Sequence, residues 1–107
     1  MQTFTEKAVA IIQQIPAGHV MTYGQVASEA GNPRGARQVV RVLHSMSKKY
    51  DLPWHRIINA QGGISTPEKA EAKGDTQRQR LESEGIQFDD KGKIPLDIYR
   101  WHPPLEI

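Results

Sequence analysis

The sequence predicts a mainly α-helical domain with short β-hairpins, in which two consecutive helices form a helix-turn-helix. Two observations lead to this class. Apolar residues recur at helical spacing in the first half of the chain, and short apolar runs flank glycine-containing turns in the second half. The 107 residues suffice for one hydrophobic core and are too few for two domains of ordinary size, so we expect a single domain over residues 1–107.

The first helix is predicted over residues 4–15 by its start signal and its apolar face. Thr3 is followed three residues later by Glu6, a spacing that can form a capping box at a helix start. Pro16 is expected to end the helix. The apolar residues that share one face are Phe4, Ala8, Ile11, Ile12 and Ile15.

A helix-turn-helix is predicted in the segment that follows. A second capping box, Thr22 with Gln25, opens a short helix that stops at the next glycine of "YGQVASEAG". Asn32 as N-cap and Pro33 at the first helical position then predict a longer helix over residues 33–47. A short helix, a tight turn and a longer helix make up this motif.

Shorter elements are predicted for the rest of the chain from turn and cap residues. "RIINA" and "GIS" around "QG" predict a hairpin, as do "IQF" and "KIPL" around "DDKG". We expect Tyr99 and Trp101 to dock the C-terminal tail on the body of the protein. The predicted ranges are a hairpin at 56–65, a mobile loop at 66–75, a helix at 76–84 capped by Asp75, a turn at 89–92 and a tail at 95–107.

The composition excludes several classes of protein and of chemistry. Without a single cysteine the chain can form no disulfide, no thiolate metal site and no cysteine nucleophile. We expect neither a metal nor a cofactor. No apolar run approaches the roughly 20 residues that span a bilayer, and the N-terminus is unlike a signal peptide, so we expect a cytoplasmic protein, associated with the nucleoid if bacterial.

Basic residues concentrate around the longer helix, although the net charge of the chain is only +2. The second helix of a helix-turn-helix enters a DNA groove, where arginines contact phosphates or base edges. Arg37 follows two small residues and could enter the base stack, or it could make an ordinary phosphate contact or a surface ion pair. Tyr23 could be a core residue, which spacing favours, or a platform for a base. The predicted DNA-binding residues are Tyr23, Arg34, Gly35, Ala36, Arg37, Gln38 and Arg41.

The segment "PWHRII", preceded by "TYGQVASEAGNPRGARQVV", carries a family resemblance. It resembles the C-terminal, winged helix-turn-helix domain of the O6-alkylguanine-DNA alkyltransferases, whose signature is Pro-Cys-His-Arg-Val and whose Cys accepts the alkyl group from a flipped guanine. Here Trp54 stands at the Cys position. This substitution, together with the expected absence of the N-terminal domain, is typical of the alkyltransferase-like proteins, and the resemblance runs over residues 4–85.

The resemblance implies roles for individual residues. Tyr23 would help to rotate the nucleotide out of a duplex bound through its minor groove, and Arg37 would fill the vacated space. The catalytic histidine, structural arginine and relay glutamate of the family correspond to His55, Arg56 and Glu84. The implied lesion pocket consists of Tyr23, Leu43, Trp54, His55, Ile64 and Ser65.

Physical chemistry argues independently against alkyl transfer. An indole nitrogen is not nucleophilic near neutral pH, so the relay has no thiol to activate. Trp54 can instead stack on a base, a contact of about 1 to 3 kcal/mol; the alternative is a buried core tryptophan. The chain departs from the family pattern at Val40 and Arg41, whose bulk should limit how deeply the helix enters the groove, and at Met46. It also departs in the loop from Pro67 to Gly74, and this departure predicts a wider pocket that accepts larger adducts.

We therefore expect a non-enzymatic, monomeric sensor that binds O6-alkylguanine in double-stranded DNA and marks it for nucleotide excision repair proteins. Two alternatives come from other classes. A winged-helix transcription regulator would read undamaged sequence through Arg34, Arg37 and Arg41. An enzyme could use His55 and Glu84 as an acid-base pair to hydrolyse the adduct.

Overall fold

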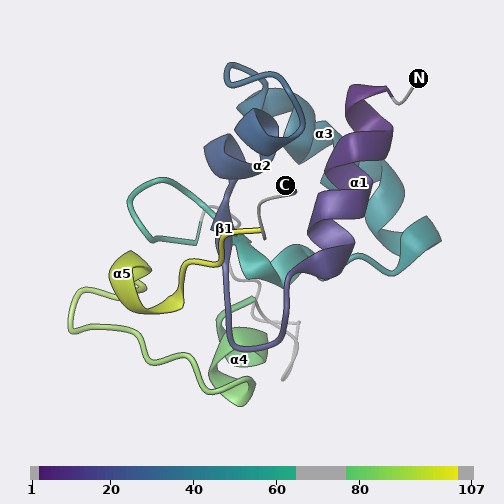
Figure 1. The fold of residues 1–107 in the computed structure, drawn as a ribbon. Coiled ribbons are helices and arrows are strands. Elements are labelled where there is room, and N and C mark those ends of the chain that lie inside the picture. Colours follow the sequence, from purple (N-terminus) through teal and green to yellow (C-terminus); the bar gives the residue numbers. More distant parts are fainter. Residues whose placement is uncertain (1–2, 65–76, 104–107) are drawn as a thin grey trace.

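The computed structural model describes residues 3–64 and 77–103, and its helices lie in two groups around a short pair of strands (Figure 1). The mainly helical class is confirmed. In chain order the elements are α1 (Phe4–Gln14), β1 (Met21–Thr22), α2 (Tyr23–Glu29), α3 (Ala36–Tyr50), the 3-10 helix η1 (Trp54–Arg56), β2 (Ile57–Ile58), α4 (Gln77–Ser83) and α5 (Leu96–Tyr99).

Helices α1, α2 and α3 pack together around the larger of two apolar clusters. Both predicted capping boxes are present: the hydroxyl of Thr3 accepts from the amide of Glu6 at 3.1 Å, and that of Thr22 accepts from the amide of Gln25 at 3.0 Å. Each cap satisfies amides that the first helical turn cannot. The fully buried members of this cluster include Ile12, Ile15, Met21, Val26, Val39 and Ile57.

The turn between α2 and α3 is longer than the sequence predicts, and Asn32 is not the N-cap of α3. The helix begins at Ala36 with Gly35 as its N-cap. Asn32 instead closes the turn, because its side-chain oxygen accepts from the amide of Arg34 at 3.3 Å and its carbonyl from that of Gly35 at 2.8 Å. Asparagine forms such side-chain turns as readily as it caps helices. Pro33 consequently lies in the turn.

The predicted hairpin over residues 56–65 is wrong for the part that the structure describes. β2 pairs in parallel with β1, with Met21 opposite Ile57 and Thr22 opposite Ile58. After β2 the chain turns at Asn59, whose side chain accepts from the amide of Gly63 at 2.8 Å. A parallel pair forms because the extended segment before α2 supplies a buried partner for the apolar Ile57–Ile58, which no local turn residue signals.

The turn predicted at residues 89–92 is present, but no strands flank it between residues 86 and 95. The amide of Asp89 donates to the carbonyl of Lys93 at 2.8 Å, and that of Gly92 donates to Asp89 at 3.0 Å. The amide of Ile94 then donates to the carbonyl of Gly62 at 2.8 Å. This contact with a distant turn replaces the cross-strand pairing of a hairpin. Ile94 joins the second cluster, whose other buried members are Val20, Ile58, Leu81 and Ile86.

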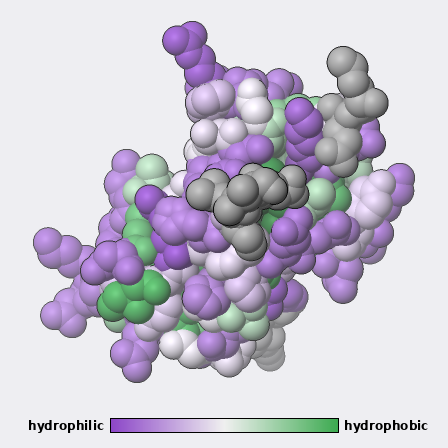
Figure 2. Space-filling model, viewed as in Figure 1, coloured by the Kyte–Doolittle hydropathy of each residue, from purple (hydrophilic) through white to green (hydrophobic). Residues whose placement is uncertain are grey.

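The start of the predicted tail crosses back over the strands, as expected from its two aromatic residues. Val20 donates to the carbonyl of Tyr99 at 2.9 Å and accepts from the amide of Trp101 at 2.8 Å. Trp101 packs on the larger cluster, and Tyr99 packs on the second. Figure 2 shows a mostly hydrophilic face with an apolar spot over α5, the helix in which Ile98 is 65% exposed.

Several predicted features lie outside the described residues. They are Ser65, the loop at 66–75 with Pro67 to Gly74, the cap at Asp75, the start of the predicted helix at Thr76 and the last residues of the tail, 104–107. Among the residues described, no helix combines the length and apolarity that crossing a membrane requires.

Candidate functional site

The Trp-His-Arg segment forms a single tight helical turn between a buried leucine and β2. Leu52 is 4% exposed, and its carbonyl accepts from the amide of Trp54 at 2.8 Å. Pro53 precedes the turn, and its carbonyl accepts from the amide of Arg56 at 3.0 Å. Three consecutive residues of a 3-10 turn point in three directions, so Trp54, His55 and Arg56 reach different surroundings.

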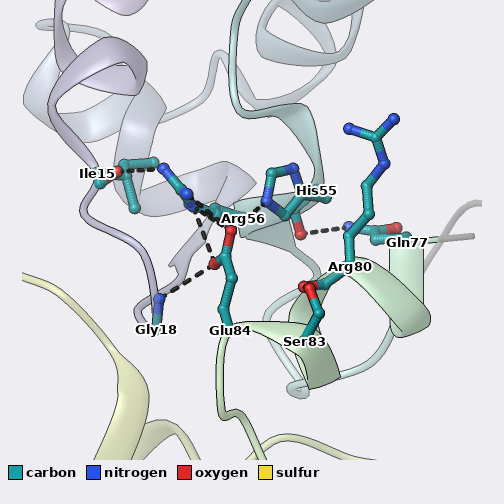
Figure 3. Close-up of polar contacts among 8 residues, drawn as sticks. All are labelled: Ile15, Gly18, His55, Arg56, Gln77, Arg80, Ser83 and Glu84. Carbon is teal, nitrogen blue, oxygen red and sulfur yellow. Dashed lines mark hydrogen bonds and ion pairs between the residues drawn. The ribbon is translucent and has the colours of Figure 1, made fainter. Parts of the chain in front are cut away.

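Glu84, just beyond the end of α4, joins this turn to two other parts of the chain (Figure 3). Its carboxylate accepts from Nε2 of His55 at 2.7 Å and from Nη2 of Arg56 at 2.7 Å. It also accepts from the amide of Gly18 at 3.1 Å. Nη1 of Arg56 donates to the carbonyl of Ile15 at 2.8 Å. We call His55, Arg56 and Glu84 the relay network; the structure brings these three predicted residues together.

The relay network fixes the charge state of its members. Burial acts to raise the pKa of Glu84, but hydrogen bonds from Arg56, His55 and Gly18 outweigh it and lower that pKa to about 2. Burial also lowers the pKa of His55, against the raising effect of Glu84 and with the further lowering effect of Arg56 and Arg80. The resting pair near neutral pH is therefore a carboxylate and a neutral imidazole.

This charge state determines the tautomer of His55. An ionised carboxylate can only accept, so the proton between the two groups is on Nε2 of the imidazole. Nδ1 is then left as an acceptor; it is buried and has no hydrogen-bond partner among the described residues. A base at Nδ1 could take a proton from a thiol, but the chain contains no cysteine to supply one.

Trp54 lies at the edge of the relay network, not within a core. It is partly exposed and belongs to neither of the two buried clusters, which argues against the alternative of a core tryptophan. Its ring stands perpendicular to that of His55, with centroids 6.0 Å apart and planes at 85°. The guanidinium carbon of Arg80 lies over the indole, 5.1 Å from the ring centroid. The indole thus has one aromatic and one cationic neighbour.

Gln77 and Arg80 are site residues that the sequence analysis missed. The amide nitrogen of Gln77 donates to the carbonyls of His55 and Ile57 at 3.0 and 2.8 Å, so it fastens α4 to η1 and β2. Its side chain is buried, with 4% exposure. In the polar run "DTQRQR" both residues look like solvated helix surface, and nothing in a single sequence distinguishes them from Gln79.

The predicted DNA-binding residues of the turn and α3 divide into exposed side chains and buried backbone. Arg34, Arg37, Gln38 and Arg41 are exposed; we call these four the recognition surface. Gly35 is buried at the helix start, where an added Cβ would lie 3.1 Å from the carbonyl oxygen of Asn32. Ala36 is partly buried. A small residue fits at Gly35 because its backbone packs against Asn32, while the side chains of Arg34 and Arg37 near it are exposed.

The other pocket residues are arranged around the two strands. Because Thr22 pairs with Ile58 in parallel, Tyr23 leaves β1 beside Asn59, at the start of the turn that leads to Ile64. Tyr23 and Leu43 are both partly buried and pack on the larger cluster, so each has a core contact as well as some exposed surface. Ile64 is partly buried.

Part of the recognition surface borders a hollow whose lining includes no residue of the relay network. The hollow, of about 320 Å³, lies where the start of α1 meets α3, lined by residues such as Phe4, Arg41 and Met46, away from Trp54. The described part of the chain gathers no group of three or more histidine, cysteine, aspartate or glutamate side chains that could hold a metal ion.

Comparisons with known proteins place this geometry in a family. The family model of the 6-O-methylguanine DNA methyltransferase DNA-binding domain matches residues 3–86. A DNA base-flipping protein of Vibrio parahaemolyticus is 44% identical over 106 residues, which cover 96% of this chain and 100% of the relative. Alkyltransferase-like protein 1 of Schizosaccharomyces pombe is 37% identical over 109 residues, covering 96% and 98%.

A solved structure agrees in fold and in sequence. S. pombe Atl1, in complex with damaged DNA containing O6-carboxymethylguanine, superposes with a TM-score of 0.77 at 36% identity, covering 96% of this chain and 100% of that one. The likeness extends over almost the whole chain, so it concerns more than the Pro-Trp-His-Arg segment. The chain belongs to the family of the 6-O-methylguanine-DNA methyltransferase DNA-binding domain, as an alkyltransferase-like member with tryptophan where the methyltransferases have their nucleophilic cysteine.

Proposed function

We propose that this protein recognises O6-alkylguanine in double-stranded DNA and holds the damaged base without repairing it. The single observation that carries this proposal is the combination at η1: the relay network is intact, yet the residue beside it is a partly exposed indole instead of a thiol. Such a site has no nucleophile to accept an alkyl group, and it retains an aromatic surface on which a base can stack.

Recognition begins at the recognition surface. Its arginines attract the phosphate backbone, and the start of α3 enters the minor groove. Arg37 then takes the place of the damaged nucleotide in the stack while Tyr23 assists its rotation outward. Extrusion costs a few kcal/mol, and less for a base that pairs poorly, which gives the protein one source of selectivity.

The flipped base is held at the two ends of the β1–β2 pair. In this proposal Tyr23, Leu43 and Ile64 form one side of the pocket. Trp54 and His55, which lie in η1 just before β2, form the other side. Ser65 belongs to the predicted pocket, and the departure of the sequence from Pro67 to Gly74 from the family pattern fits a pocket that takes larger adducts. The protein acts as a single domain and a monomer in the cytoplasm, and the flipped lesion on distorted DNA is the signal that nucleotide excision repair proteins read.

Two duplexes that differ in one base test the proposal. We expect a gel shift to show tighter binding to a duplex with one O6-methylguanine than to the same duplex with guanine, and a labelled methyl group to remain on the DNA after incubation. Equal binding to both duplexes would favour a regulator that reads undamaged sequence. Release of the label would favour hydrolysis by His55 and Glu84.

The indole itself offers a second readout. In a Trp101→Phe background Trp54 is the only tryptophan, since the chain has two. Stacking of a base on Trp54 should quench its fluorescence with the lesion duplex and leave it unchanged with the undamaged duplex. Quenching by both duplexes alike would contradict a lesion-specific contact at this ring.

A further inference from the structure

The turn that leads from β2 to Ile64 is held by the side chain of Asn59. Its Oδ1 accepts from the amide of Gln61 at 3.0 Å and from that of Gly63 at 2.8 Å. These two bonds fix which end of the side-chain amide is oxygen, so the other end, Nδ2, is a donor. Nδ2 makes no hydrogen bond within the described residues.

A second donor lies against the same turn and comes from the segment after α4. The amide of Ile94 donates to the carbonyl of Gly62 at 2.8 Å, which brings the neighbouring Lys93 to the turn. A Cβ added at Gly63 would lie 2.9 Å from Nζ of Lys93 and 3.2 Å from Nδ2 of Asn59. Because Gly63 has no side chain, two nitrogen donors converge over its backbone.

The chemistry of these two donors suits an anion. A lysine ammonium is positively charged and can only donate, and the nitrogen of a side-chain amide is also a donor. No ion pair among the described residues includes Lys93. The carboxylate of Asp89 accepts instead from the backbone amides of Lys91 and Lys93, at 2.9 Å each.

The location of the donors indicates which anion they meet. Gly63 directly precedes Ile64, and Tyr23 leaves β1 beside Asn59, so the donors lie between two residues of the proposed pocket. A nucleotide that rotates into this pocket stays joined to the phosphates on either side of it. These phosphates are therefore drawn toward the edge of the pocket, where the donors are.

We propose that Lys93 and Asn59 bind a backbone phosphate next to the flipped nucleotide. This contact lies apart from the recognition surface, and Lys93 lies beyond residues 3–86, which the family model matches. The inference rests on the proposed function, because only a flipped nucleotide draws its phosphate to this edge. The bound phosphate holds the distorted backbone while Arg37 occupies the vacated position in the stack.

The first experiment measures affinity by fluorescence anisotropy for two duplexes that differ in one base, guanine or O6-methylguanine, over a series of salt concentrations. Lys93→Gln keeps the backbone bonds of its turn. It should weaken binding to the lesion duplex a few-fold, reduce the slope of log affinity against log salt by about one for that duplex, and leave the guanine duplex unchanged. Asn59→Asp keeps the oxygen that holds the turn and replaces the donor, so it should also weaken lesion binding. Wild-type lesion affinity in either variant would overturn the role of that residue.

The second experiment identifies the phosphate. A neutral methylphosphonate replaces, in turn, the phosphate on either side of the lesion. At one of the two positions the replacement should weaken binding of the wild type and have little further effect on Lys93→Gln, because that variant has already lost the contact. Equal losses in the two proteins at both positions would overturn the inference.

Lys91→Gln is the matched control for charge. Lys91 is exposed in the same turn, and it is not among the atoms nearest to a Cβ at Gly63. This variant removes the same charge and should leave the preference for the lesion unchanged. An equal effect of Lys91→Gln, or equal weakening of both duplexes by Lys93→Gln, would overturn the inference while lesion binding persists. If the wild type bound the two duplexes equally, the proposed function would fail, and the inference with it.

Discussion

The recognition surface and the relay network both contain arginine, but the arginines are exposed in the first and largely buried in the second. Arg34, Arg37 and Arg41 are exposed around the start of α3. Arg56 is only 19% exposed in its side chain and is bound by a carboxylate on one side and by the carbonyl of Ile15 on the other. The exposed arginines have surface available for contact with a ligand, whereas the guanidinium of Arg56 is already bound within the protein.

This difference separates what the protein uses for binding from what it uses to hold its shape. An ion pair between exposed groups contributes little to stability, while breaking a buried one leaves an uncompensated charge. A relay network that has no thiol to activate still connects η1, α4 and the segment before β1. The relay network thus has a structural role, and the base replacement and phosphate contacts proposed for the helix-turn-helix lie with the exposed arginines of the recognition surface.

The largest effect is expected from breaking the relay network. Glu84→Ala should lower the free energy of unfolding by about 3 to 5 kcal/mol, because Arg56 loses its partner in a site of low exposure and Gly18 loses its acceptor. Urea denaturation followed by circular dichroism measures this loss. Glu82→Ala, two residues earlier and within α4, is the control: Glu82 pairs with Arg78 at 3.4 Å on the exposed face, so its loss should change stability by less than about 1 kcal/mol. Equal effects of the two substitutions would refute a structural role for the network.

The opposite pattern is expected on the recognition surface. Arg37→Ala should leave the unfolding free energy within about 0.5 kcal/mol of the wild type, because the side chain is exposed. It should abolish specific binding to an O6-methylguanine duplex, since nothing then fills the vacated position in the stack.

A gel shift measures this loss, and Lys91→Ala is its control. Lys91 is an exposed residue in the turn after α4, so its substitution removes one positive charge without touching the recognition surface. If the Arg37→Ala variant bound the lesion duplex with wild-type affinity, the role proposed for this residue would be wrong.

The sequence predicted those parts of the fold whose signals are local. The capping boxes at Thr3 and Thr22 correctly gave the starts of α1 and α2. The start of α3 was misplaced because the same Asn-Pro pair that opens a helix can close a turn. The parallel pairing of β1 with β2 depends on contacts between segments far apart in the chain, and no local pattern encodes it.

Only part of the candidate site could be predicted from the sequence. The family resemblance named His55, Arg56 and Glu84, and the structure brings them within hydrogen-bonding distance. The sequence did not predict Gln77 and Arg80 as site residues, because their contacts depend on which face of α4 packs against η1. That face is set by a single buried apolar residue of the helix, Leu81, in an otherwise polar segment. A helix with so few apolar positions gives too weak a periodicity to orient from sequence.

Acidification should lower the stability that depends on the relay network. Burial lowers the pKa of His55 below its ordinary 6.5, so below that pH the unfolded chain binds a proton that the folded protein does not, and stability falls as pH falls. The pKa of Glu84, about 2 against 4.5, adds a second loss that begins near pH 4.5 and continues toward pH 2.

Urea midpoints from about pH 7 down to about pH 5.5 isolate the first of these effects. His55→Gln is the control, because it removes this imidazole and keeps the other three of the four histidines. We expect a shallower fall in the variant than in the wild type over this range. A wild-type midpoint that rises on acidification would contradict the neutral, buried imidazole.

The smallest effect is expected at Arg34, and it tests whether the residues of the recognition surface are interchangeable. Arg34 lies in the turn before α3 and is exposed, so its proposed role is a phosphate contact. Arg34→Ala should weaken binding to damaged and undamaged duplexes by the same few-fold factor, and should reduce the slope of log affinity against log salt by about one. This contrasts with Arg37→Ala, which should remove the preference for the lesion. Affinities at a series of salt concentrations for both duplexes measure the two effects. If Arg34→Ala instead reduced lesion preference at constant slope, base replacement would be shared between the two arginines, and the assignment of this step to Arg37 alone would be wrong.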